Sequence, residues 1–352
     1  MVSAVATRDP RVLALRVGPV SARIRTRSAV VIGLLGAAAL GTMLLALTVG
    51  RGGLEPGSIL YALTPDASKA DRLVFEWRGS RALAAIVFGA CLGVSGAIFQ
   101  TVTRNPLGSP DVIGLNAGSY AGVVAVISLG GIGFTAMAVG SITGGLVAAA
   151  AVYLLAFKQG VNGFRLIIVG IAVGAVLTSL TSWFSVKSDL DVALRAAIWG
   201  AGSLNGTRWE VLAAAGGLAL VTALALPHVA RVLPQLALGD DAASSLGLRL
   251  EPTKALLVVV GVVLSALVTA VTGPIQFIAL AAPQIARRLV TPGGGSGPDV
   301  VGSALVGAVL LGTADLLAQY ALPGTTVPVG AVTVVLGGVY LVWLLFRESG
   351  RS

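Results

Sequence analysis

Very few side chains in this sequence could carry out chemistry. Its 352 residues include one histidine, His228, and one cysteine, Cys91, whereas metal sites with imidazole or thiolate ligands use three or four such residues. No Gly-Lys dipeptide occurs in the chain, so the P-loop pattern GxxxxGK[ST] is absent. The sequence therefore excludes a P-loop ATPase and a histidine- or cysteine-based metal centre. It predicts a chain that is not an enzyme and that binds no cofactor or metal of its own.

Asp315 is the one clear ionisable residue inside a long apolar stretch. Acidic groups at membrane depth often mark proton or ion sites, so an ion-coupled secondary transporter is one interpretation. Such a carrier needs partner groups, for instance a second acid, a histidine or a lysine, and the apolar stretches supply none. The isolation of Asp315 favours the alternative, in which its carboxylate caps or binds a neighbouring helix.

The composition indicates that the lipid bilayer is the solvent of this chain. Hydrophobic residues make up 56% of it and charged residues only 11%, against about 25% charged residues in soluble domains. The net charge of +9 does not indicate nucleic acid, because the basic residues lie at the ends of apolar stretches, with no patch of interleaved aromatics. We expect membrane lipids as partners and no nucleic acid. Pairs of glycines at four-residue spacing predict closely packed helices: Gly89/Gly93, Gly114/Gly118/Gly122, Gly140/Gly144 and Gly170/Gly174.

Apolar stretches of about 20 residues, the length that crosses a bilayer, recur along the chain. Residues 255–286 carry no charge and are too long for one span, so we expect a break at Thr272-Gly273-Pro274. Another boundary falls in the glycine-rich residues 130–133. We therefore predict an all-α polytopic membrane protein with about ten transmembrane helices, at 29–49, 82–102, 112–130, 134–157, 166–186, 209–227, 254–272, 274–290, 300–319 and 329–346.

The distribution of lysine and arginine predicts the orientation. Residues 1–28 carry six arginines without the features of a cleaved signal peptide, so they form a basic tail before a retained first span. With this tail in the cytoplasm, ten spans place most of the 24 basic residues on the cytoplasmic side. The transmembrane domain then covers residues 29–346, and 347–352 form a second cytoplasmic tail. The glycine- and proline-rich residues 291–298 are expected to be a cytoplasmic turn.

Residues 236–250 form a polar interval between two apolar stretches, inside a cytoplasmic loop at about 228–253. Asp240 or Asp241 can cap the first turn of a short helix, and Gly247 can end it in a left-handed conformation. A structured helix in a loop suggests that a cytoplasmic partner binds it, and its core is expected at residues 238–247. The contact residues of this loop are predicted to be Leu238, Gly239, Asp240, Asp241, Ala242, Ser245, Leu246 and Gly247.

Residues 78–122 contain a recognisable series of motifs. They read RGSRALAAIVFGACLGVSGAIFQTVTRNPLGSPDVIGLNAGSYAG, where Asn105 and the two following prolines indicate a sharp turn. The series resembles the signature of the FecCD family, the permease subunits of type II ABC importers for iron–siderophore complexes, haem and vitamin B12. The resemblance extends over the chain beyond residue 30. It includes residues 199–203, the 239–247 interval, the segment 273–287, Ala314-Asp315 and 328–333.

This resemblance implies a fold of ten helices per subunit and an ATP-driven import function. The implied partners are a cytoplasmic ABC ATPase dimer that binds ATP and Mg²⁺, a second permease subunit, and an extracytoplasmic substrate-binding protein. The implied location is the cytoplasmic membrane of a bacterium, with both termini in the cytoplasm. The expected cargo is a ferric siderophore, with haem or vitamin B12 as the alternatives within the family. Residues 238–247 would be the helix that couples to the ATPases.

The resemblance also assigns residues, with two departures from the family pattern. Arg78 and Arg81 are candidates for docking the binding protein, or else interfacial anchors, and Ser80 stands where the family has proline. Gln319 replaces a later family arginine, which weakens a second docking contact and favours a heterodimer of permeases. The translocation path is expected to be uncharged. Its candidate residues, with the motif positions, are Ser95, Gln100, Asn105, Pro106, Asn116, Gln276 and Pro283.

Overall fold

The computed structural model describes most of the chain. The described residues are 2–5, 12–17, 20–50, 53–62, 64, 66–131, 133–157, 163–290, 299–322 and 325–349. The turn expected at 291–298 and the last three residues of the predicted C-terminal tail lie outside this set.

The N-terminal tail contains three short antiparallel strands, which the sequence analysis did not predict. They are β1 (Val2–Val5), β2 (Val12–Val17) and β3 (Val20–Arg25), hydrogen-bonded in the order β1-β2-β3. Apolar and polar residues alternate along β3, as in a strand with one apolar face. Helix α1 (Thr26–Thr48) begins directly after β3, so the first span starts three residues earlier than expected.

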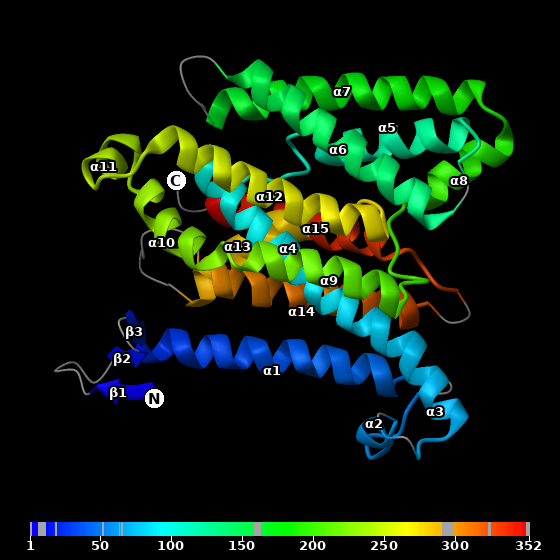
Figure 1. Cartoon of the computed structure of the whole chain (residues 1–352), viewed down its shortest axis with the longest axis horizontal. Helices are drawn as coiled ribbons and strands as arrows, with labels where there is room; N and C mark the ends of the chain where they lie inside the picture. The colour runs from blue at the N-terminus through cyan, green and yellow to red at the C-terminus, as the bar shows by residue number, and fades with distance from the viewer. Residues whose placement is uncertain are drawn as a thin grey trace.

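The described residues from α1 to the end of α15 form a bundle of long helices, which confirms the predicted fold class (Figure 1). All ten predicted spans correspond to helices. Six of the described helices are long and apolar enough to cross a membrane, and the bent pair α9–α10 can count as a seventh, so the count of ten stays a prediction. The helices at the ten positions are α1, α4 (Ser80–Thr103), α5 (Leu115–Ser128), α6 (Phe134–Ala156), α7 (Gly163–Lys187), α9 (Trp209–Ala223), α12 (Leu250–Thr272), α13 (Ile278–Val290), α14 (Val300–Tyr320) and α15 (Val329–Ser349).

Short elements connect these helices at both ends of the bundle. At the end near Trp77, α2 (Ser58–Tyr61) and α3 (Lys69–Val74) precede a π-helical turn, η1 (Phe75–Gly79), which continues into α4. Helix α8 (Leu190–Gly200) lies between α7 and α9. At the opposite end, α10 (Leu226–Ala237) leads to α11 (Asp240–Ser245) (Figure 1). Pro227 lies in the first turn of α10, where the chain bends by 53°.

Two pairs of helices share one design, in which a long helix is followed by a short one. The first pair is α4 and α5, with 24 and 14 residues, and the second is α12 and α13, with 23 and 13 residues. Both long helices end at a residue with positive φ, Arg104 and Gly273, and another such residue, Gly114 or Phe277, directly precedes each short helix. The break expected at 272–274 is therefore confirmed, and α13 begins four residues later than predicted.

The two pairs are joined by a reciprocal set of hydrogen bonds. Gln100, three residues before the end of α4, donates to the Leu280 carbonyl in the first turn of α13 at 2.9 Å. Thr269, three residues before the end of α12, donates to the Asn116 side chain in the first turn of α5 at 3.2 Å. Each long helix therefore holds the start of the other pair's short helix.

The glycine pairs pack helices together, as predicted from their spacing. A Cβ built on Gly122 of α5 would overlap the Gly140 carbonyl of α6, and a Cβ on Gly89 of α4 would overlap the Gly307 carbonyl of α14. These contacts bring the backbones together, which is how small residues associate helices in membranes.

Candidate functional site

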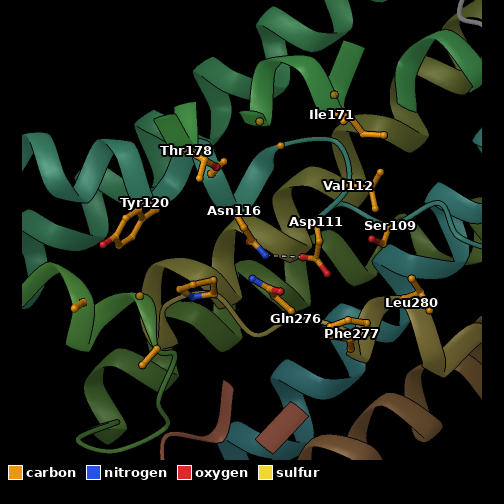
Figure 2. A pocket seen from close by; sticks show the side chains of 18 residues that line it. Ser109, Asp111, Val112, Asn116, Tyr120, Ile171, Thr178, Gln276, Phe277 and Leu280 are labelled. Atoms are coloured by element: carbon orange, nitrogen blue, oxygen red, sulfur yellow. Dashed lines mark hydrogen bonds between the residues drawn. The ribbon is translucent and has the colours of Figure 1, made fainter. Parts of the chain in front are cut away.

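A cavity of about 840 Å³ lies where the two helix pairs meet. The non-helical segments 105–114 and 273–277 form part of its wall, and α5, α7, α8 and the start of α13 form the rest. The polar side chains that line it are Ser109, Asp111, Asn116, Tyr120, Thr178 and Gln276. Figure 2 shows Gln276 directed toward Asp111 and Asn116.

Asp111 connects the two non-helical segments. Its carboxylate accepts a hydrogen bond from the Asn116 side-chain amide at 2.6 Å (Figure 2) and another from the Phe277 backbone N–H. No lysine or arginine lines the cavity among the described residues. Asp111 is an ionisable residue in the cavity wall, and the expectation of an uncharged path stays a prediction. The sequence analysis missed Asp111, and the signal available was its position at the start of an apolar stretch, directly after Pro110.

Hydrogen bonds hold the segment 105–114 in place beside the cavity. The Asn105 side chain accepts from the Leu107 backbone N–H at 2.8 Å, as expected for a turn residue, and Gln284 of α13 donates to the Pro106 carbonyl at 2.6 Å. Pro283 leaves the Ala279 carbonyl without its helical partner, and Gly96 of α4 packs against that carbonyl so closely that a Cβ would overlap it. The motif residues Asn105, Pro106 and Pro283 thus shape the junction between α4 and α13.

The candidate path residues divide into two groups. Asn116 and Gln276 line the cavity. Ser95 is buried and donates to the Gly261 carbonyl of α12 at 2.7 Å, and buried Gln100 binds α13. Ser95 and Gln100 lie in contacts between helices outside this cavity, and a role for them in the path stays a prediction.

The predicted cytoplasmic helix exists but is shorter and differently capped. Helix α11 spans Asp240–Ser245, and the residue at its N-cap is Gly239, with no side-chain cap. The prediction that Asp240 or Asp241 caps the helix is therefore wrong, since both lie in its first turn. Gly247 adopts φ +87° and ends the helix, as predicted.

Helix α11 has an inward and an outward side. Ala243 is fully buried, and Asp240 Oδ1 and Oδ2 lie 2.6 Å from Arg104 and 2.9 Å from Lys254. On the outward side, Leu238 and Leu246 are 55% and 62% exposed. Of the remaining predicted contact residues, Asp241, Ser245 and Gly247 are exposed, and Gly239 and Ala242 are half-buried.

The opposite end of the bundle contains an ion pair between helices. Arg81 of α4 donates to both carboxylate oxygens of Asp315 on α14, at 2.7 and 3.0 Å, and the Asp315 side chain is 2% exposed. Gln319 donates to the same carboxylate at 2.8 Å, and Asn205 accepts from Arg81. Asp315 therefore binds a neighbouring helix, as the isolation of this residue suggested.

The second docking candidate, Arg78, is a half-buried residue in the π-helical turn. Its guanidinium donates to the Val49 carbonyl at 2.5 Å and to the Tyr320 hydroxyl at 3.3 Å. Ser80, which departs from the family's proline, donates to the Thr207 carbonyl at 2.8 Å. Arg78 lies at the surface while Arg81 lies between helices, so docking by either residue stays a prediction.

The sequence and the fold were compared with known proteins. Residues 38–347 match the family model of the FecCD transport family. The chain is 44% identical to the ferric enterobactin transport system permease protein FepG of Escherichia coli, over 85% of this chain and 90% of that protein. It is 34% identical to the iron(3+)-hydroxamate import system permease protein FhuG of Bacillus subtilis (87% and 93%), and 32% identical to the hemin transport system permease protein HmuU of Yersinia pestis (87% and 93%).

A solved structure shows the same fold. It is an inward-facing conformation of a metal-chelate type ABC transporter, with a TM-score of 0.80 and 25% sequence identity, covering 91% of this chain and 99% of that one. The family match and the relatives are permease subunits rather than enzymes. Together with the apolar helices, they show that this multi-pass membrane protein belongs to the FecCD transport family.

Proposed function

We propose that this chain is the permease subunit of an ATP-driven importer that carries ferric siderophore complexes across the cytoplasmic membrane of a bacterium. The observation that carries the proposal is a polar cavity between two broken helix pairs, with an exposed short helix, α11, at the far end of the same helices. The relatives support the cargo, since ferric enterobactin and ferric hydroxamate permeases are 44% and 34% identical to this chain.

Haem is the second candidate cargo. The similarity to a hemin permease favours it, although at 32% identity this relative is more distant than the enterobactin permease. The ion-coupled alternative loses its main support, because Arg81 and Gln319 bind the Asp315 carboxylate.

The cytoplasmic partner in this proposal is an ABC ATPase dimer, which holds ATP and Mg²⁺. Leu238 and Leu246 flank α11 as exposed apolar side chains in a polar loop, and a partner that covers them removes apolar surface from water. Both termini then lie in the cytoplasm, and a substrate-binding protein docks at the opposite end, beside Arg78. ATP changes the cavity only if the ATPases bind one conformation of the permease more tightly than the other.

A second permease subunit completes the path in this proposal. Helix α7 has the least buried apolar window of the candidate spans, 11%, yet it exposes the hydroxyl residues Thr178 and Ser182. A second copy of the fold facing α7 would cover this side of the cavity. Gln319 binds Asp315 where the family has an arginine, which favours two unequal permeases, a heterodimer.

Uptake into right-side-out membrane vesicles that are loaded with ATP tests the proposal. Vesicles from a strain that co-expresses the chain with an ABC ATPase, a second permease subunit and a substrate-binding protein are given ⁵⁵Fe-enterobactin, with haemin and cyanocobalamin as competitors. ATP-dependent ⁵⁵Fe uptake that only excess ferric siderophore suppresses is the expected result. Uptake that persists without ATP and follows an ion gradient would overturn it, and competition by haemin would favour the second cargo.

The ATPase contact has its own test. Leu238→Asp with Leu246→Asp should abolish co-purification of the ATPase, because a charge is placed at each apolar anchor. Arg231→Asp, an exposed change on neighbouring α10, is the control and should retain the ATPase.

A further inference from the structure

The carboxylate of Asp240, whose side chain is 38% exposed, contacts two basic residues of the helix bundle. One oxygen lies 2.6 Å from Arg104 at the end of α4, and the other lies 2.9 Å from Lys254 in the first turns of α12. The Lys254 side chain is 8% exposed. The first contact joins α11 to the end of α4, and the second joins it to α12. Both of these long helices lead to the cavity.

Arg104 has an unusual backbone conformation for an arginine. It ends α4 with φ +50°, and Asn105 N–H bonds back to the Gln100 carbonyl, which is the pattern of a helix end that normally has glycine at this position. A side chain makes this conformation unfavourable. The ion pair with Asp240 gives a reason for an arginine here, because glycine would make the turn more easily and lose the pair.

The two contacts of Asp240 lead to the same place. From Arg104, the chain runs through the segment held by Gln284 to Asp111 in the cavity. From Lys254, helix α12 runs to Thr269, which donates to Asn116. Asn116 in turn donates to Asp111 at 2.6 Å, so both routes end at one hydrogen-bonded pair in the cavity wall.

We infer that the cluster Arg104–Asp240–Lys254, here the coupling clamp, transmits movement of α11 to the Asp111–Asn116 pair. Asp240 and Arg104 are positioning residues, which act through the two helix pairs and touch neither ATP nor cargo. This inference rests on the proposed function, because it presupposes an ATPase bound to α11. It adds that the ATPase grips the outward side of α11 while Asp240 holds the inward side.

The test measures how accessible the cavity is to a labelling reagent, and it needs no knowledge of the cargo. Ile171, a cavity residue of α7 that is 56% exposed, is replaced by cysteine in a Cys91→Ala background. The whole transporter is purified with its ATPases, reconstituted in liposomes and labelled with a maleimide, with and without ATP and vanadate. The reference carries the intact coupling clamp, and trapping with ATP and vanadate should change its labelling rate severalfold.

Arg104→Gly is the decisive variant, because it relieves the backbone and removes the ion pair. It should retain the ATPase, hydrolyse ATP and keep its thermal stability, while the ATP-induced change in labelling disappears. Asp240→Asn should behave in the same way, and Arg104→Lys should restore part of the change. Arg231→Gln, an exposed arginine of α10 with no ion pair among the described side chains, is the matched control and should respond as the reference does.

Two outcomes would overturn the inference, and each is distinct from failure of the proposed function. A normal ATP-induced labelling change in Arg104→Gly shows that the clamp is not needed for transmission. A variant that loses the ATPase or unfolds, including Arg104→Lys, shows that the cluster only supports structure or assembly. Failure of the proposed function is recognised earlier, because the reference transporter itself would then retain no ATPase.

Discussion

Arg81 and Asp315 form an ion pair that crosses from α4 to α14 in the buried interior of the bundle. Their closest atoms lie 2.7 Å apart, and the side chains are 15% and 2% exposed. An ion pair at this depth leaves a costly charge behind when one partner is removed. It therefore fixes the relative position of two helices, and its residues should respond to mutation as a unit.

Single and double substitutions of this pair should give unequal losses of stability. Arg81→Met and Asp315→Leu should each lower the free energy of unfolding by roughly 3–5 kcal/mol, because the other charge is left buried. The double variant should recover much of the loss. The measurement is thermal unfolding of the detergent-solubilised protein in a double-mutant cycle. Arg195→Gln, which removes an exposed pair with Asp191, is the control and should cost about 0.5 kcal/mol or less; additive losses in the cycle would contradict the prediction.

Reversing the charge of Arg78 should weaken docking of the substrate-binding protein without weakening the fold. The residue is half-buried at this end of the bundle, and charges at the rim of an interface mainly change the association rate and its salt dependence. Arg78→Glu should slow association about tenfold at low salt, with a smaller difference at high salt. Surface plasmon resonance on the assembled transporter measures this rate, with Arg195→Glu on α8 as the comparison. An unchanged rate would contradict a docking role and leave Arg78 a structural residue, which holds Val49 and Tyr320.

A single methyl group should disturb the contact between α5 and α6. Gly122→Ala places a Cβ on the Gly140 carbonyl and should destabilise the protein by about 1–3 kcal/mol. Gly174→Ala is the matched control, because its Cβ would lie 3.6 Å from the Cα of Gly114, which is an ordinary van der Waals contact. Thermal unfolding compares the two variants, and equal stabilities would show that α5 and α6 can separate at no cost.

Filling the cavity should stop uptake while leaving the complex assembled. Thr178→Trp on α7 adds a large ring to the cavity lining, so iron uptake should fall at least tenfold in the vesicle assay. Leu180→Trp adds the same ring on this helix at an exposed position outside the lining and should retain uptake. Normal uptake by Thr178→Trp would place the cargo's route elsewhere.

Residue patterns predicted the helices well and the site only in part. Hydropathy and glycine spacing located the spans, the break at Thr272-Gly273-Pro274 and the left-handed Gly247, because each depends on local chemistry. The ion pairs Arg81–Asp315 and Arg104–Asp240 each join residues more than a hundred positions apart in the sequence. No local pattern carries that information, and for this reason Asp240 was assigned to a helix cap.

The two non-helical segments, 105–114 and 273–277, have a consequence for the contents of the cavity. Backbone N–H and C=O groups outside a helix cannot face lipid, since nothing there bonds them, and at membrane depth they must be buried in protein or face water. The described wall of the cavity combines these segments with a carboxylate and two amides. Lipid therefore cannot cover these two segments, and the cavity presents hydrogen-bonding groups to whatever occupies it.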